Sequence, residues 1–246
     1  MSASTDVHGP VKRVLMLASN PATSPVTGWP VGFWWAELTH PYWEFTEAGY
    51  ELTIASPDGG RLVPDGYSDP EDASGYSAHD LISLGFKHSP THSALIEDTP
   101  PLADIHPAEY DALFLVGGQA PMVTFAEDER VHQLVVDVHD SGRMTAVVCH
   151  ATAVLLKTRR ADGTLLVDGK TWTGFADSEE AYADSFAGQR IQPFWIETEA
   201  KKITTTNFVV ASRFRSFALR DGNLVTGQQQ YSGAAAARLV IQALGV

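Results

Sequence analysis

The chain has 246 residues, of which 44% are hydrophobic, and its formal net charge at pH 7 is −13. This length and apolar content are enough for the packed core of one large α/β domain. The negative charge argues against binding to nucleic acid or to an anionic membrane surface. No apolar run approaches the roughly 18–20 residues that span a bilayer. The first residues, "MSASTDVHGP", lack the basic start and apolar centre of a secretory signal, and with a single cysteine we expect a cytoplasmic protein.

Short apolar runs alternate with helical patterns along the chain. Strands are predicted at 11–19, 50–56, 111–118 and 144–149, and helices at 127–141, 151–157 and 232–246. The strands lack clean polar–apolar alternation, which is typical of strands covered on both faces in a mostly parallel sheet. The order of the elements predicts an α/β fold in which helices sandwich a doubly wound sheet.

Residues 57–110 differ in composition from the segments on either side. The stretch "GGRLVPDGYSDPEDASGYSAHD" is rich in Gly, Pro, Asp and Ser, which favours an excursion over the surface. No interdomain linker is visible, so we expect one domain, 1–246, with an inserted surface flap at 57–110. His88 and His92 have a metal-ligand spacing, but Pro90 interrupts the helical pattern between them, so we expect no metal site.

Cys149, the sole cysteine, ends the fourth predicted strand and precedes the helix predicted at 151–157. In an open parallel sheet, ligands bind at the carboxyl ends of the strands. A strand–turn–helix of this kind is typical of a nucleophile elbow. The helix N-terminus is expected to lower the pKa of the thiol. The alternative is a buried structural cysteine, and position alone does not decide between the two.

Two neighbours extend this hypothesis. His150 follows the thiol directly, so its imidazole could orient a reacting group or transfer a proton, and its backbone N–H lies where an oxyanion would develop. Gly118 ends the neighbouring strand in "VGG" and could supply a second N–H. The alternative for Gly118 is an ordinary tight turn.

An acidic residue lies in the aromatic stretch "GWPVGFWWAELTHPYWEF", residues 28–45. Glu37 is surrounded there by apolar residues, and a buried carboxyl group near a thiolate should have a raised pKa and could shuttle a proton. The alternative is an exposed residue on an amphipathic helix. Pro41, four residues later, predicts a kink or a helix start.

The chain resembles the DJ-1/PfpI superfamily, and within it the Hsp31-like, glyoxalase III-like branch. The resemblance is carried by "GFWWAELTHP", "SPDGG", "TPPLADIHPAEYDALFLVGGQAPM", "VVCHATAVLL", "LLVDGKTWTGFADSEE" and "RDGNLVTGQQQYSG". It implies a flavodoxin-like sandwich and a homodimer.

The resemblance also implies a role for individual residues. Cys149 matches the nucleophile, His150 the adjacent histidine, and Glu37 the acid that hydrogen-bonds the cysteine. Glu180 falls where the branch places the carboxylate that orients the histidine, although Glu179 is only one position away. The amides of Gly118 and His150 would form the oxyanion site.

The chain departs from the branch's usual pattern at two places near the thiol. The usual "GGHGPM" is "GGQAPM" here, with Gln119 and Ala120, and the usual "CHGP" is "CHAT", with Ala151 in the turn beside the thiol. Gln119 can hydrogen-bond but cannot act as an acid or base near neutral pH. With Trp34 or Trp35 as a flat wall, these changes predict weak turnover of methylglyoxal and better turnover of a bulkier, more apolar electrophile.

The resemblance implies a cofactor-independent cysteine enzyme for a small electrophilic carbonyl compound. Cys149 would form a hemithioacetal with a 2-oxoaldehyde, and Glu37 with His150 would move the protons that yield a 2-hydroxy acid. One alternative is a hydratase or hydrolase of a different, bulkier electrophile. Another is a holdase chaperone or redox sensor without turnover, for which an exposed thiol of low pKa is expected.

Overall fold

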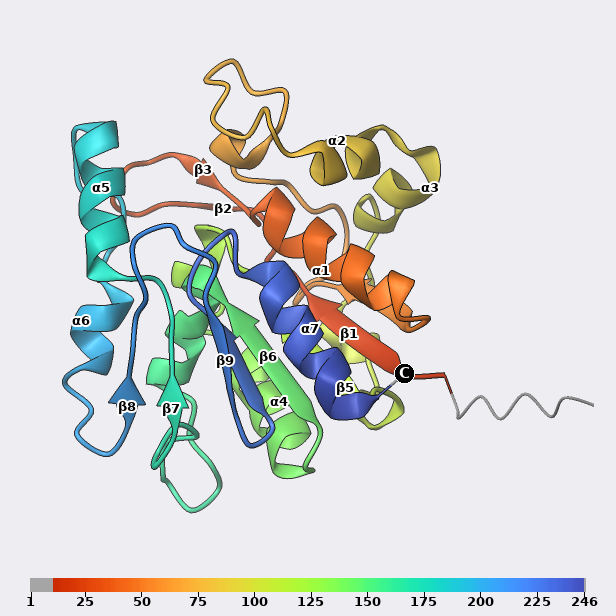
Figure 1. Ribbon diagram of the computed structural model, residues 1–246, viewed down its shortest axis with the longest axis vertical. Coiled ribbons are helices and arrows are strands. Elements are labelled where there is room, and N and C mark those ends of the chain that lie inside the picture. Colours follow the sequence, from red (N-terminus) through yellow and green to blue (C-terminus); the bar gives the residue numbers. More distant parts are fainter. Residues whose placement is uncertain (1–10, 246) are drawn as a thin grey trace, which may run out of the picture.

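The computed structural model describes residues 11–245 (Figure 1). The ten N-terminal residues, on which the expected absence of a secretory signal depends, lie outside this range. Within it, the helices are all too short or too polar to cross a membrane.

The central sheet has six strands in the order β4-β1-β5-β6-β10-β9. In that order their bounds are Glu51–Ala55, Arg13–Leu17, Ala112–Leu115, Met144–Val148, Leu224–Gly227 and Ala218–Asp221. Neighbouring strands pair in parallel except β10 and β9, which are antiparallel. The predicted mostly parallel α/β fold is therefore confirmed, and the four predicted strands are β1, β4, β5 and β6.

Helices cover both faces of this sheet (Figure 1). On one face, α1 (Trp35–Glu47) packs against α7 (Gly233–Leu244), and α7 lies over β6, β9 and β10. On the other face, α4 (Glu129–Asp140) packs against β5 and β6. The helices predicted at 127–141 and 232–246 are α4 and α7.

Strand β1 shows why the sequence lacks visible alternation. Leu15 and Leu17 belong to the apolar core on the α4 face, whereas Val14 and Met16 belong to the core beneath α1 and α7. Successive side chains of a strand point to opposite faces. Because both faces are covered, both sets are apolar.

The remaining helices and strands are short. They are β2 (Ala22–Thr23), β3 (Pro30–Val31), α2 (Leu81–His88), α3 (Pro90–Ser93), β7 (Thr171–Trp172), α5 (Asp177–Ala187), α6 (Ile196–Ala200) and β8 (Asn207–Phe208). Short 3₁₀ turns occupy 66–68, 94–96, 102–104, 107–109 and 120–122. In Figure 1, α5 and the segment that contains α2 both lie toward the top of the view.

Residues 57–110 join β4 to β5 and do more than cross the surface. The segment includes α2, whose Phe86 is buried and packs edge-on against Trp35 of α1, with ring centroids 6.0 Å apart. The Gly- and Pro-rich composition predicted no core element here. Phe86 escaped notice because a helix of eight residues is too short to show a clear period.

Helix α1 passes through Pro41 without starting or ending there. The expected helix start is therefore wrong, because the helix already begins at Trp35. Pro41 cannot make the backbone hydrogen bond of its turn, and its ring lies directly against Gly233 of α7.

Candidate active site

The thiol stands at the carboxyl end of β6, where the sequence predicts an elbow. Cys149 follows the last residue of β6 and has a φ of 56°, in the left-handed region that non-glycine residues rarely adopt. Such a residue costs on the order of 1–3 kcal/mol and persists only where its surroundings hold it. The segment that follows, Cys149–Leu156, is a 3₁₀ helix and not the predicted α-helix.

The glycine pair after β5 allows three segments to meet at the thiol. A Cβ on Gly117 would lie 2.1 Å from Oε2 of Glu37 and 2.7 Å from Cβ of Cys149. A Cβ on Gly118, whose φ is 116°, would lie 2.5 Å from the carbonyl oxygen of Gly32. The pair is therefore more than an ordinary turn, because a side chain at Gly117 would collide with the acid and the thiol, and one at Gly118 would collide with the backbone before α1.

Glu37, in the first turn of α1, is completely buried, and its carboxyl group faces the thiol of Cys149 and the backbone of Gly117. Neither carboxyl oxygen has a hydrogen-bond partner of ordinary geometry. Burial raises the pKa of Glu37 to about 8, and the charge of nearby Asp65 adds to this. Glu37 therefore holds a proton at neutral pH, as the sequence predicts for an acid in an apolar site.

The thiol itself does not behave as expected. Cys149 is 2% exposed, and burial together with the neighbouring Glu37 raises its pKa well above the ordinary value. The prediction of a lowered pKa is wrong, because desolvation outweighs the helix-terminus effect. The backbone N–H groups of His150 and Gly118 face the sulfur and partly oppose this rise in the pKa. These are the two amides expected to form an oxyanion site.

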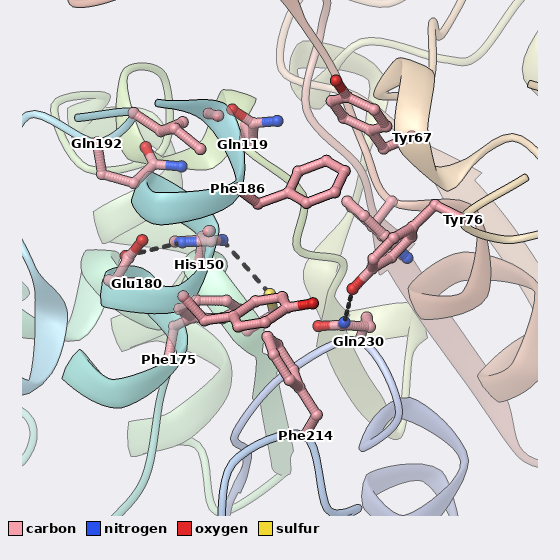
Figure 2. A pocket seen from close by; sticks show the side chains of 16 residues that line it. Tyr67, Tyr76, Gln119, His150, Phe175, Glu180, Phe186, Gln192, Phe214 and Gln230 are labelled. Atoms are coloured by element: carbon pink, nitrogen blue, oxygen red, sulfur yellow. Dashed lines mark hydrogen bonds and ion pairs between the residues drawn. The ribbon is translucent and has the colours of Figure 1, made fainter. Parts of the chain in front are cut away.

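His150 contacts the thiol and a carboxylate at the same time (Figure 2). Its Nδ1 lies 3.5 Å from Sγ of Cys149, and its Nε2 lies 3.0 Å from Oε1 of Glu180, which α5 provides. The imidazole also stacks on Phe175 at a centroid distance of 4.0 Å. An adjacent histidine thus reaches the sulfur, because the strained turn at Cys149 brings the two side chains to one side.

Glu179 serves a different purpose from its neighbour Glu180. Its Oε1 accepts hydrogen bonds from the backbone N–H of Phe214 at 2.8 Å and from Nε2 of Gln228 at 2.9 Å. Phe214 has a φ of 54°, so Glu179 fixes a second strained residue. The alternative left open in the sequence is thus resolved geometrically, with Glu180 beside the histidine.

Asp65 is a buried carboxylate that the sequence did not single out. Its Oδ1 accepts a hydrogen bond from the N–H of Gly32 at 2.9 Å, and its Oδ2 accepts one from the N–H of Gln119 at 2.7 Å. It thereby ties the turn after β5 to the loop before α1. Burial raises the pKa of Asp65 to about 7.

A pocket lies over the thiol, and its volume is about 730 Å³ when the space open to solvent at its mouth is included. Of the predicted binding residues, Trp34 and Gln119 line it, whereas Ala151 does not, because Ala151 is fully buried in the core on the α4 face. Trp35 is buried in the opposite core, beneath α1. Six further aromatic residues, which the sequence did not indicate as binding residues, also line the pocket: Tyr67, Tyr76, Phe175, Tyr182, Phe186 and Phe214.

Only a weak sequence signal could have found these walls. Tyr182 and Phe186 are four residues apart on α5 and share a face, and they follow Glu180 by two and six residues. Asp65 stands in "VPDGY", which has the composition of a turn. Its burial depends on the path of the chain after Gly60, and no local pattern gives that path.

Comparisons with known proteins agree with the observed fold. The DJ-1/PfpI family matches residues 32–243. "Glyoxalase 3" of Candida albicans is 26% identical over 241 residues, which cover 95% of this chain and 98% of that protein. "Glutathione-independent glyoxalase HSP31" of Saccharomyces cerevisiae is 25% identical and covers 96% of this chain and 98% of its own length.

Solved structures show the same fold. Rapid Encystment Protein 24 KDa of Francisella tularensis superposes with a TM-score of 0.84 at 24% identity, covering 96% of this chain and 100% of that one. Glyoxalase III from Candida albicans superposes with a TM-score of 0.75 at 23% identity, covering 94% of this chain and 97% of that one.

Proposed function

The chain belongs to the DJ-1/PfpI family, and on that premise we propose that it converts 2-oxoaldehydes into 2-hydroxy acids without glutathione. One observation carries the proposal. The sole thiol lies between a protonated acid, Glu37, and a histidine, His150, that a buried carboxylate orients. The names of the curated relatives, which cover nearly the whole chain, point to the same activity.

The first step is addition of the thiol to the aldehyde. Sγ of Cys149 bonds to the aldehyde carbon, and the thiol proton passes to the Nδ1 of His150, which lies 3.5 Å away. The aldehyde oxygen gains the negative charge and accepts hydrogen bonds from the N–H groups of Gly118 and His150. Proton donation by Glu37 or His150 then gives a neutral hemithioacetal.

Isomerisation and hydrolysis complete the cycle. A base removes the hydrogen of the former aldehyde carbon, and a proton is returned to the neighbouring carbonyl carbon, which converts the hemithioacetal to the thioester of a 2-hydroxy acid. Water then attacks the thioester and releases the acid and the free thiol. Glu37 and His150 are the two side chains beside the sulfur that can accept and donate a proton in these steps. No net oxidation or reduction occurs, because the aldehyde carbon is oxidised as its neighbour is reduced.

The redox-sensor alternative fits the site less well. It predicts an exposed thiol of low pKa, whereas Cys149 is buried and its pKa is raised.

Product analysis with methylglyoxal tests the proposal. The wild-type protein should form lactate, and mass spectrometry should find the adduct on Cys149, which is unambiguous because the chain has one cysteine. Cys149→Ala should keep the wild-type fold, because a small side chain is lost at the edge of a pocket, and should form no lactate. If it retained more than a few per cent of wild-type activity, covalent catalysis by Cys149 would be wrong.

A further inference from the structure

The pocket over Cys149 is walled by aromatic rings that contact one another from distant parts of the chain. Tyr76 packs edge-on against Trp34, with centroids 6.0 Å apart, and Tyr67 lies 6.4 Å from Tyr76. Tyr67 in turn contacts Phe186 of α5 at 5.9 Å. The segment before α1, the 57–110 segment and α5 are thus joined in one aromatic wall around the mouth (Figure 2).

Two rings that line the pocket, Phe214 and Tyr76, are held in place by hydrogen bonds or by backbone strain. Phe214 has a left-handed φ, and Glu179 accepts the hydrogen bond of its N–H group. Its ring packs against Tyr182 at 5.3 Å. The hydroxyl of Tyr76 accepts a hydrogen bond from Gln230 at 3.1 Å. A site that holds its rings in place before any ligand arrives favours a rigid, flat, apolar partner.

The charges of the residues that line the pocket narrow the class of substrate further. Neither lysine nor arginine lines the pocket among the described residues, and its one carboxylate, Glu180, is occupied by His150. The other side chains with oxygen donors or acceptors are uncharged: they are glutamine amides and tyrosine hydroxyls. Among the amides, Gln119 has its Oε1 buried without a partner. A carboxylate or phosphate on the substrate would enter this pocket without a counter-charge, which is costly.

Resting on the proposed function, we propose that the preferred substrate is an uncharged aryl 2-oxoaldehyde, with one aromatic ring on the keto carbon. The ring lies among Trp34, Tyr76 and Phe186, while the aldehyde carbon faces Sγ of Cys149. Methylglyoxal leaves most of this aromatic surface in contact with water, so it gains little binding energy from it. The chemistry is unchanged, and phenylglyoxal gives mandelate.

Four aldehydes test this inference: methylglyoxal, phenylglyoxal, cyclohexylglyoxal and 4-carboxyphenylglyoxal. We expect kcat/KM for phenylglyoxal to exceed that for methylglyoxal at least tenfold, mainly through KM. Cyclohexylglyoxal should fall between them, because it is apolar but not flat. The carboxylated ring should be at least tenfold worse than phenylglyoxal. Product is measured as the hydroxy acid by chromatography.

A pair of variants links the preference to the wall. Phe186→Ala should lower kcat/KM for phenylglyoxal at least fivefold more than for methylglyoxal, and Phe186 is 60% exposed, so its loss should not affect folding. Trp43→Ala, which removes an aromatic residue that is 52% exposed on α1 outside the pocket, should leave the ratio unchanged.

The outcomes separate the two proposals. If methylglyoxal is converted as well as phenylglyoxal, or if Phe186→Ala leaves the ratio unchanged, the aryl preference is wrong and the glyoxalase function stands. If no aldehyde yields a hydroxy acid, both proposals fail.

Discussion

Glu37, the buried acid beside the thiol, should lower the stability of the folded protein at any pH at which it is ionised in the unfolded chain. Burial raises the pKa of Glu37 from 4.5 to about 8. Between these two values the folded protein keeps a proton that the unfolded chain has released, so the free energy of unfolding falls as pH rises. Below pH 4.5 both states are protonated, and above about pH 8 both are ionised, so this dependence is confined to the interval between them.

Glu37→Gln removes this ionisation while keeping the shape of the side chain. Each unit of pKa shift is worth about 1.4 kcal/mol, so a shift of about 3.5 units corresponds to at most about 5 kcal/mol. The side chain is completely buried, so solvent does not screen this term. The amide places unpartnered N–H groups in the same space, which costs about 1–3 kcal/mol. We therefore expect the variant to be about 2–4 kcal/mol more stable than wild type at pH 9.

Urea unfolding followed by tryptophan fluorescence at pH 5, 7 and 9 measures this difference. Relative to wild type, Glu37→Gln should gain stability as pH rises, by about 1.4 kcal/mol per unit, up to about pH 8. Glu47→Gln, on an exposed position of the same helix, is the matched control and should show no such trend. A difference between Glu37→Gln and wild type that is the same at pH 5 and pH 9 would refute a buried, protonated Glu37.

The same variant separates stability from catalysis. The glutamine keeps a hydrogen-bonding group near Sγ but cannot transfer a proton. We expect kcat to fall roughly 10²-fold or more, the usual contribution of a general acid or base. If the rate equals that of wild type, Glu37 serves only for packing.

The other predictions concern the groups that hold the site together. Glu180→Gln keeps an acceptor for His150 but removes the negative charge, so kcat/KM should fall about tenfold or more; an unchanged rate of hydroxy-acid formation would argue against an orienting role. Asp65→Asn can accept only one of two backbone N–H groups, and should lower the free energy of unfolding by about 1–3 kcal/mol; equal urea midpoints would contradict this. Gly117→Ala would place a methyl group 2.1 Å from the carboxyl group of Glu37, so it should lower the melting temperature and abolish turnover, and a fully active variant would show that the backbone can move aside.

The sheet could be predicted from the sequence because its inner strands are short apolar runs with glycine or polar residues at their ends. Runs such as "DALFLVGG" and "TAVVC" have this form. Strands β9 and β10 were not predicted, because Ala218–Asp221 contains two charged residues and Leu224–Gly227 contains Thr226, so neither is a continuous apolar run. Strand β5 is equally short, but all four of its residues are apolar.

The centre of the site was predictable for a different reason. The thiol, the histidine and the glycine pair lie at the ends of neighbouring parallel strands, so the topology alone brings them together. Glu37 stood out as an acid in an aromatic stretch, and the family resemblance added its place beside the cysteine, whereas Glu180 came from the resemblance alone. In the structure Glu37 faces the thiol and Glu180 contacts His150. Their catalytic roles stay predictions.

The thiol pKa and the pocket wall could not be predicted. The position of Cys149 at a predicted helix start does not show how deeply the sulfur is buried. Burial determines the direction of the pKa shift of the thiol, so this direction could not be predicted. The rings of Tyr67 and Phe186 meet across 119 residues of sequence. Contacts of that kind depend on tertiary structure and leave no local pattern.

The reacting groups and the aromatic wall of the pocket come from different segments of the chain. Substitutions in one of them can therefore leave the other intact. Cys149, His150 and Glu37 stand directly after β6 and in the first turn of α1, where a small shift would break the close approach at Gly117. The aromatic wall comes largely from the long connections on either side of the sheet, whose ring positions can be exchanged without disturbing a strand. Descendants can therefore acquire new substrates by altering surface connections while inheriting the same reaction.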